Sequence, residues 1–376
     1  MNLARAKRKI LFVTGTRADF GKLKSLALGA SAAGHEVSFF VTGMHVLPEY
    51  GLTKLEVHRL PDIQVTEFVN QRTTDPQDLT FAKTVTGFSD YLRIDPPDLV
   101  VIHGDRVEAM AAALVCATNY IRSAHIEGGE VSGTIDEAFR HCNTKLATAH
   151  LVSSEDAGRR IRSMGESSES VFVIGSPELD LHNAESGVSI GEVKNRYEIP
   201  FDEYGVAVFH SVTSEQDSIE AQALALFDTL KASGRTFVVI QPNNDPGSNV
   251  ILDIIRTLPA DRFRVLPSMR FTHFSELLKN AALIIGNSSV GVREAPFLGI
   301  PSIDIGTRQT NRSRAPSISS LDADDTQSIS RIINGHWGVR FAPDTGFGHG
   351  ESVDKFLGVI EGDSFWKLPL QKNFSE

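Results

Sequence analysis

Short apolar runs that alternate with helical segments constrain this chain more than any other feature of its sequence. In the first half, the runs are rich in Val, Ile and Phe and end at glycine or polar residues, as buried strands do. They are KILFVT, EVSFFVTG, DLVVIHGD, SAHIEGGE, HLVSS and SVFVIGSP. Helical segments separate most of them. Strands that alternate with helices predict βαβ units and therefore a parallel, doubly wound sheet.

The alternation stops after about residue 180 and then starts again. Residues 181–205 are polar and carry no strand-like run, and further runs follow them: GVAVFHSVTS, RTFVVIQPN, RFRVLP, ALIIGNSS and PSIDIG. We therefore predict an α/β protein with two Rossmann-like domains, residues 1–182 and 183–355, and a tail, 356–376, that returns to the first domain. Ligands of open α/β sheets bind at the carboxyl ends of the strands, so we expect the site in a cleft between the two sheets.

The composition limits which partners the chain can bind and where in the cell it is expected. The 376 residues carry a formal net charge of −10, and such a chain is a poor nucleic-acid binder because the phosphate backbone needs a basic surface. The longest apolar stretch, AMAAALVCA, is too short to span a membrane, and the run after the basic N-terminus is too short for a signal peptide. We interpret Cys116 and Cys142 as buried thiols. A soluble, cytoplasmic protein is expected.

The polar motifs of the first half directly follow predicted strands. GTRADFG (15–21) combines a tight turn with a helix N-terminus, where Arg17 can pair with a phosphate. HGDR (103–106) places an acid and a base at the end of another strand, and HIEGGEVSGTIDEAFRH (125–141) adds further histidines, carboxylates and glycines. Each motif also has a simpler explanation, as a surface arginine in a turn or a salt-bridged loop.

The carboxylates of residues 125–141 have such an ordinary explanation too. A serine or threonine of VSGT can cap the following helix, and Asp136 and Glu137 would then complement its dipole in the first turn. Asp136 and Arg140 are four residues apart, as are Glu137 and His141, so each pair can form a helical ion pair. Arg140 and His141 either orient the acids or are plain helix charges.

The second half carries features that suit a phosphorylated ligand. His210 ends its first strand, the turn-rich loop QPNNDPGS follows the next, and Ser288 and Ser289 open a helix where hydroxyls and free amides can hold a phosphate. Glu294, further along that helix, can accept hydrogen bonds from ribose hydroxyls. GTRQTNR adds two arginines, Arg308 and Arg312. The chain has no metal-ligand spacing, and GTRADFG is neither GxGxxG nor a Walker loop, so we expect no metal and no NAD.

Together, these motifs are similar to those of a known family. The hydrolysing UDP-N-acetylglucosamine 2-epimerases resemble this chain from about residue 9 to past residue 312, in GTRADFGKL, VTGMHVLPEYG, HGDR, HIEGGEVSGTIDEAFRH, NSSVGVREAPFLGIP and GTRQTNR. The resemblance implies the glycosyltransferase-B architecture, a homodimer and no cofactor. The implied reaction is anti elimination of UDP to 2-acetamidoglucal, then hydration on the other face at C2. The product is N-acetylmannosamine for sialic acid or surface polysaccharide synthesis.

The resemblance also assigns roles to individual positions. It implies three catalytic acids, Asp105, Glu127 and Asp136, and a histidine that assists the departing diphosphate, His210. The UDP contacts that it implies are Arg17, Arg106, Asn243, Ser288, Ser289, Glu294 and Arg308, with Arg270 or Phe271 at the uracil. His125 and Glu130 are placed in the substrate site as well. Gly21 is a departure, because some members have a serine there and its hydroxyl contact to phosphate would be absent.

Other functions stay open on the sequence. Relatives in legionaminic acid synthesis apply the same mechanism to a UDP- or GDP-linked 2,4-diacetamido-trideoxy sugar. A glycosyltransferase of the same fold would need an acceptor site and would leave the acids of EGGE without a role. A nucleotide-sugar sensor needs no cluster of three acids. Substitution of Asp105 distinguishes an enzyme from a sensor. An enzyme would lose turnover and still bind UDP, whereas a sensor would lose nothing measurable.

Overall fold

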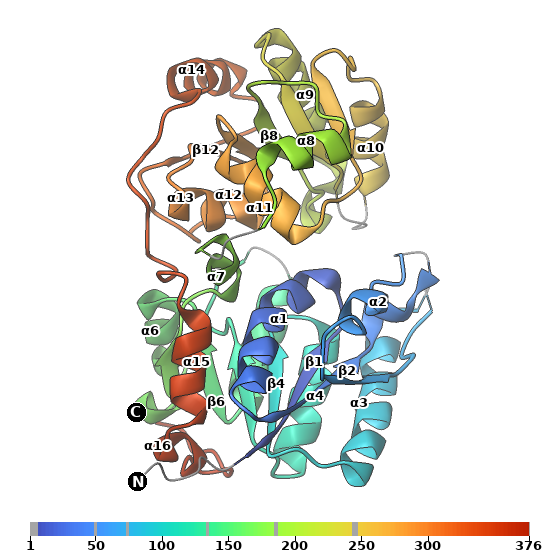
Figure 1. The fold of residues 1–376 in the computed structure, drawn as a ribbon, viewed down its shortest axis with the longest axis vertical. Helices are drawn as coiled ribbons and strands as arrows, with labels where there is room; N and C mark the ends of the chain where they lie inside the picture. Colours follow the sequence, from blue (N-terminus) through green and yellow to red (C-terminus); the bar gives the residue numbers. More distant parts are fainter. Residues whose placement is uncertain are drawn as a thin grey trace. The chain divides into compact units, whose positions relative to one another are not determined.

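The chain folds into two compact units. The structure is a computed structural model that describes residues 7–48, 51–72, 75–132, 135–183, 187–242 and 247–375. The first unit comprises residues 1–130, 135–180 and 347–376, and the second comprises 131–134 and 181–346 (Figure 1). The returning segment therefore joins the first unit at residue 347, earlier than the expected 356. The backbone N–H of Ser176 donates to the carbonyl of Phe347 (2.8 Å), which ties this segment to the first unit.

The first unit is built on a seven-stranded parallel sheet with the order β3-β2-β1-β4-β5-β6-β7. Its strands are β1 (Lys9–Thr14), β2 (Glu36–Val41), β3 (Gln64–Glu67), β4 (Leu99–His103), β5 (Ser123–Ile126), β6 (Ala149–Val152) and β7 (Val171–Val173). The order reverses between β1 and β4, which are paired. This reversal makes the carboxyl ends of β1 and β4 the switch point at which open sheets bind ligands.

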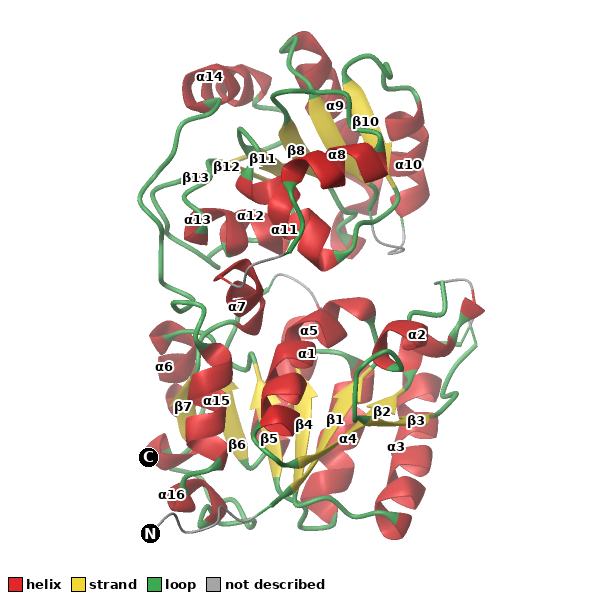
Figure 2. Ribbon diagram, in the orientation of Figure 1, coloured by secondary structure: helices red, strands yellow, loops and turns green. Residues whose placement is uncertain are grey.

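Helices cover both faces of this sheet (Figure 2). They are α1 (Arg17–Ala32), α2 (Lys54–Val57), α3 (Gln77–Ile94), α4 (Val107–Thr118), α5 (Ile135–Leu146), α6 (Glu155–Ser163), α15 (Ser352–Ile360) and α16 (Asp363–Trp366). A further helix, α7 (Pro177–Asn183), begins in the first unit, and its last residues, from Leu181, belong to the second. Because side chains alternate along a strand, Phe12 packs with α1 and α15, while Leu11 packs with α3 and α4. A Cβ on Gly29 of α1 would lie 2.4 Å from a methyl carbon of Val353, so α1 and α15 pack closely.

The second unit repeats the design with a six-stranded parallel sheet of order β10-β9-β8-β11-β12-β13. The strands are β8 (Gly205–Val208), β9 (Phe237–Ile240), β10 (Phe263–Leu266), β11 (Ile284–Gly286), β12 (Ser302–Ile305) and β13 (Ile318–Leu321). The helices are α8 (Ile190–Tyr197), α9 (Ile219–Ala232), α10 (Ser248–Arg256), α11 (Phe271–Lys279), α12 (Ser289–Val292), α13 (Glu294–Phe297) and α14 (Thr326–His336). Its switch point lies between β8 and β11.

The structure confirms the predicted α/β class with two parallel sheets and adds two strands that the apolar pattern did not indicate. These strands, β3 and β13, each lie at one edge of a sheet and are only partly buried, so they lack a continuous apolar run. Cys116 is buried as expected, and its burial raises the pKa of the thiol. The expectation for Cys142 is wrong, because it lies on the exposed side of α5. Among the described residues, no helix is both long and apolar enough for a membrane span.

Candidate active site

The predicted site residues of the first unit follow the strands of its switch point. Arg17 begins α1 directly after the turn that ends β1, and Asp105 and Arg106 follow β4. In the β4–β5 register His103 pairs with Ile126, so Asp105 and Glu127 follow neighbouring strands at the same edge of the sheet. The parallel order therefore gathers side chains that are about a hundred residues apart in the sequence.

The turn between β1 and α1 is held by Asp19. The Thr16 side chain caps α1, and the carboxylate of Asp19 accepts from the backbone N–H groups of Gly15 (3.0 Å) and Thr16 (3.1 Å). Thr14 Oγ1 also lies 3.0 Å from His45 Nε2, and burial lowers the pKa of His45. The Arg17 guanidinium, by contrast, is about half exposed and pairs with Glu56. Asp19 thus stabilises the turn from which Arg17 projects.

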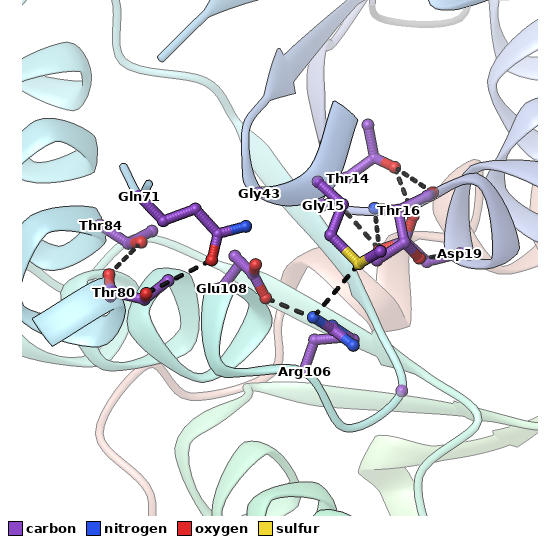
Figure 3. Close-up of polar contacts among 12 residues, drawn as sticks. Thr14, Gly15, Thr16, Asp19, Gly43, Gln71, Thr80, Thr84, Arg106 and Glu108 are labelled. Atoms are coloured by element: carbon purple, nitrogen blue, oxygen red, sulfur yellow. Dashed lines mark hydrogen bonds and ion pairs between the residues drawn. The ribbon is translucent and has the colours of Figure 1, made fainter. Parts of the chain in front are cut away.

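Arg106 lies among carboxylates of the first unit (Figure 3). Its Nε is 3.5 Å from Glu108 Oε2, and Glu108 is 1% exposed with no hydrogen bond to either carboxylate oxygen in the described part of the chain. The Glu108 carboxylate raises the pKa of Arg106, and Asp19, Asp105 and Asp136 act in the same direction. Arg106 therefore supplies positive charge to the acids of this unit.

A close backbone approach leaves room for Glu108. Gly43 has φ = +63°, and a Cβ there would lie 2.6 Å from both Glu108 Oε1 and the carbonyl oxygen of Gly15. Its N–H donates to Asn70 Oδ1 (3.0 Å), and Asn70 in turn donates to Thr84 Oγ1 of α3 (2.8 Å). Only glycine combines this φ with this contact, so Gly43 shapes the wall beside Glu108.

Glu127 is held by two groups that the sequence did not single out, and by His103 of the HGDR motif. Lys22 Nζ of α1 lies 3.0 and 2.8 Å from its two carboxylate oxygens, and Ser176 Oγ donates to Oε1 (3.0 Å). His103 Nε2 is 3.3 Å from Oε2. The backbone of Glu127 has φ = +60°, a conformation that costs a non-glycine residue about 1–3 kcal/mol and is typical of functional sites.

Asp105 forms an ion pair with Arg140 of α5. Arg140 is buried, and it also donates to the backbone carbonyl of Glu130 (3.2 Å). The structure therefore favours the interpretation in which Arg140 orients the acids. His141 and Glu137 form the expected pair along the helix surface (3.5 Å). The cap expected before α5 falls in part on residues 133–134, which lie outside the described residues.

His125 is completely buried below this cluster. Its Nε2 donates to the carbonyl of Gly104 (2.7 Å), Thr144 Oγ1 lies 3.3 Å from Nδ1, and burial lowers its pKa to about 3. The neutral imidazole has a hydrogen-bond partner at each ring nitrogen, and through Gly104 it supports the loop before Asp105. Glu130 is likewise 2% exposed and accepts a hydrogen bond from Ser153. Neither of these predicted substrate contacts presents a free side chain.

In the second unit, His210 follows β8 and is tied to the segment after β11. The backbone of His210 exchanges two hydrogen bonds with the side chain of Asn287, at 2.7 and 2.8 Å. Arg308 Nη1 donates to the Asn287 carbonyl (3.1 Å), and Gln309 Nε2 donates to the same oxygen (2.9 Å). Ser288 caps α12, as expected. His210, Ser288, Ser289 and Arg308 are therefore brought together by Asn287.

The helix expected after Ser289 is broken. It divides into α12 and α13 at Arg293, whose φ and ψ are −120° and −61°, so Glu294 begins the second segment. Glu294 Oε1 lies 3.0 Å from His182 Nε2. Arg270 precedes α11 with no capping side-chain hydrogen bond among the described residues, and Phe271 begins the helix. Asn243 lies outside the described residues, and a Cβ on Gly21 would meet nothing within 4 Å.

The main contacts that the sequence did not reveal come from Lys22, Ser176 and His182. Lys22 belongs to the GTRADFGKL motif, which is the only sequence signal that pointed to it. Ser176 lies just before α7 and His182 lies within it, and neither belongs to a polar motif that the sequence singled out. Among the described residues, no group of three or more His, Cys, Asp and Glu side chains is arranged to hold a metal ion.

Comparison with known proteins identifies similar sequences over most of the chain. A family model described as UDP-N-acetylglucosamine 2-epimerase matches residues 30–361. The chain is 40% identical over 373 residues to UDP-N-acetylglucosamine 2-epimerase of Neisseria meningitidis serogroup B, and the alignment covers 98% of each protein. It is 32% identical over 341 residues to polysialic acid biosynthesis protein P7 of Escherichia coli, covering 87% of this chain and 85% of that protein.

The chain is also similar to a relative that is named for a different sugar, and to two proteins of known structure. The UDP-N,N′-diacetylbacillosamine 2-epimerase (hydrolyzing) of Legionella pneumophila is 31% identical over 323 residues, covering 84% of this chain and 85% of that protein. The structure of a Neisseria meningitidis UDP-GlcNAc 2-epimerase bound to UDP-GlcNAc has a TM-score of 0.80 at 18% identity, covering 94% of this chain and 99% of that one. The Methanocaldococcus jannaschii enzyme with UDP-GlcNAc and UDP has a TM-score of 0.76 at 17% identity, covering 94% and 99%.

The two structural matches confirm the expected fold class, and the sequence matches show the family. The family model spans most of the chain, and the Neisseria serogroup B relative aligns over nearly its whole length. The chain belongs to the UDP-N-acetylglucosamine 2-epimerase family.

Proposed function

We propose that this chain is a hydrolysing 2-epimerase that converts UDP-N-acetylglucosamine to UDP and N-acetylmannosamine for sialic acid or capsule synthesis. The observation that carries the proposal is the acid cluster at the carboxyl ends of β4 and β5. There Asp105 pairs with Arg140, and Glu127 is bonded to Lys22. The hydrolysing assignment is supported by the HIEGGEVSGTID segment and by the 31%-identical Legionella relative that is named as hydrolysing.

In the proposed first step, UDP leaves C1 of the sugar as a base takes the proton from C2. The C2 proton is weakly acidic, so the C1–O bond breaks early and positive charge develops on the ring. Carboxylates near the ring stabilise that charge, and we assign this role to Asp105, Glu127 and Asp136. One of the three accepts the C2 proton, and a C1=C2 double bond forms as the C1–O electron pair leaves with UDP.

In the second step, water adds across the double bond of 2-acetamidoglucal. Its hydroxyl joins C1, and a protonated group delivers a proton to C2 from the face opposite to the one that was deprotonated, which inverts C2. Clustered carboxylates shift one another's proton affinity, which lets one accept a proton as another donates one. Lys22 and Arg140 supply the balancing positive charge and hold Glu127 and Asp105 in place.

The second unit is proposed to hold UDP. Ser288, Ser289 and Arg308 lie around Asn287, where they would bind the diphosphate, with His210 beside the departing group. Glu294 would accept hydrogen bonds from the ribose, and Phe271 or Arg270 would contact the uracil. Arg17 of the first unit is proposed as a further diphosphate contact. A homodimer and a cytoplasmic location, both supported by the family resemblance, belong to the same proposal.

Proton NMR in deuterated water tests the reaction. The protein is incubated with UDP-N-acetylglucosamine, and we expect UDP together with N-acetylmannosamine that carries deuterium at C2. An Asp105→Asn variant is expected to lose this turnover and to keep its UDP affinity. Unchanged substrate would contradict the assignment, and the diacetamido-trideoxy sugar nucleotide of the Legionella relative would then be tested in the same way.

A further inference from the structure

A buried chain of three polar side chains in the second unit has no part in the steps above. His182 Nδ1 lies 2.7 Å from Ser275 Oγ of α11, and His182 Nε2 lies 3.0 Å from Glu294 Oε1 of α13. Ser275 is 0% exposed, His182 3% and Glu294 6%. Three segments that are far apart in the sequence thus meet through one imidazole, which is a costly arrangement unless it has a role.

The direction of the hydrogen bonds follows from the chemistry of the groups. A carboxylate only accepts, so His182 Nε2 carries the hydrogen and donates to Glu294. In the neutral ring Nδ1 is then the acceptor, and the Ser275 hydroxyl donates to it. Ser275 therefore selects the tautomer that His182 needs in order to hold Glu294.

This arrangement engages only one oxygen of Glu294. Within the described part of the chain, no hydrogen bond reaches Oε2, whereas Oε1 is bonded to His182. With Oε1 held, the carboxylate cannot rotate freely, and Oε2 keeps one direction. A fixed carboxylate oxygen suits the vicinal hydroxyls of a ribose, which both donate hydrogen bonds.

His182 also contacts the residue that begins α11. Its ring centroid lies 5.4 Å from that of Phe271, with an angle of 53° between the ring planes. Phe271 and Ser275 are four residues apart on α11 and so lie on the same face of the helix. The imidazole of His182 therefore contacts both Phe271, which is assigned to the uracil, and Glu294, which is assigned to the ribose.

We propose that His182, assisted by Ser275, is a positioning residue for the nucleoside, which it serves by fixing the Glu294 carboxylate for the ribose 2′- and 3′-hydroxyls. This inference rests on the proposed function, because it takes Glu294 as the ribose contact. It makes His182 a determinant of specificity for ribonucleotides over deoxyribonucleotides, although His182 itself need not touch the ribose.

Calorimetric titration with UDP and 2′-deoxy-UDP tests this role. A hydrogen bond to a charged group contributes enough for the wild-type protein to bind UDP about ten- to a hundredfold more tightly than 2′-deoxy-UDP. We expect Glu294→Gln and His182→Phe to reduce this ratio to about threefold or less, and Ser275→Ala to give an intermediate ratio. His182→Gln keeps an amide donor for Glu294 and is expected to restore part of the ratio.

Tyr204→Phe is the matched control. The Tyr204 hydroxyl donates to the carbonyl of Leu277 on α11 (2.8 Å), and in the described part of the chain no hydrogen bond joins it to His182, Ser275 or Glu294. The variant removes one buried hydrogen bond to α11, yet its preference for UDP over 2′-deoxy-UDP is expected to equal that of the wild type. A general loosening of the helix would lower the ratio in this variant too, and would overturn the proposal.

The outcomes separate the inference from the function on which it rests. A wild-type ratio in both His182→Phe and Ser275→Ala, with the ratio lost in Glu294→Gln, would overturn the role of His182 and leave Glu294 as the ribose contact. The ribose assignment itself would be overturned if Glu294→Gln left the preference for UDP over 2′-deoxy-UDP unchanged. It would also be overturned if the wild-type protein bound the two nucleotides about equally. If His182→Phe does not fold, Ser275→Ala and His182→Gln decide the question.

Discussion

The ammonium nitrogen of Lys22 lies 3.0 and 2.8 Å from the two carboxylate oxygens of Glu127, and 3.6 Å from Glu178 Oε1. Lys22 is on α1, Glu127 follows β5 and Glu178 is on α7. Both carboxylates are buried, at 4% and 5% exposure. One lysine thus balances two buried acids, and one of these acids is assigned to the reaction.

Replacement of Lys22 by Met is expected to destabilise the protein strongly. It leaves Glu127 and Glu178 buried without this cation, and the loss of one partner of a buried ion pair costs about 3–5 kcal/mol. Lys22→Arg keeps the positive charge, so its free energy of unfolding is expected to fall by less than that of Lys22→Met. Urea unfolding measures both, and a double-mutant cycle with Glu127→Gln should show that the combined loss is smaller than the sum. Strictly additive losses would contradict the coupling.

Arg140 is expected to affect turnover more than UDP binding. Arg140→Met removes the partner of Asp105, and a catalytic group misplaced by about 1 Å can cost about a hundredfold in rate. UDP affinity should change by about threefold or less, because the second unit is proposed to hold UDP. The measurements are kcat for UDP release and the Kd of UDP. His141→Ala, on the same helix at its partly exposed side, is the control and should keep both values.

Gly43 and Gly34 make a matched pair for the backbone approach beside Glu108. Both have positive φ, +63° and +92°, but a Cβ on Gly43 would lie 2.6 Å from Gly15 O, whereas one on Gly34 would meet nothing within 4 Å. Alanine at either position should cost about 1–3 kcal/mol of unfolding free energy. Only Gly43→Ala should also lower kcat/KM, because it displaces Glu108 and with it Arg106. Equal kcat/KM in the two variants would refute this.

Glu166 should contribute stability that depends on pH. Burial disfavours its charge, but hydrogen bonds from His150, Lys145 and Lys372 outweigh burial and lower its pKa from 4.5 to about 2. Because the folded pKa is the lower one, the contribution is complete above about pH 4.5 and is lost as the pH falls towards 2. Lys372 also donates to the carbonyls of Thr144, Lys145 and Ala147, so Glu166 ties the C-terminal segment to the end of α5.

Unfolding curves of the wild type and Glu166→Gln measure this contribution. At neutral pH the variant should be less stable by about 3 kcal/mol, since it leaves two lysines and His150 without their carboxylate. The difference between the two proteins should shrink as the pH falls from 4.5 to 2. The exposed Glu169→Gln serves as the control. A difference that stays constant over this range would show that Glu166 is not the titrating group.

The sequence predicted the site to the extent that its residues follow buried strands. Asp105, Glu127 and Ser288 follow apolar runs that end at a turn. The parallel sheet of the first unit then places Asp105 and Glu127 at one edge, and Ser288 follows β11 of the separate sheet in the second unit. The contacts of Lys22 and His182 follow no such rule, because both residues lie on helices and no local pattern reports how a helix packs. Ser176 does follow a predicted strand, β7, but nothing local indicates its hydrogen bond to Glu127. The same reason explains β3 and β13, whose half-exposed edge positions carry no apolar signal.

By itself, the sequence determined the α/β class, because strand periodicity and turn chemistry are local properties, and its motifs indicated the family by resemblance. The tertiary structure alone decided which charges meet. Arg140 pairs with Asp105, which follows another strand, His125 is buried as a neutral support, and His182 joins α7 to Glu294. These pairings arise when distant segments are buried together, since a buried polar group must find its partner wherever the packing places one.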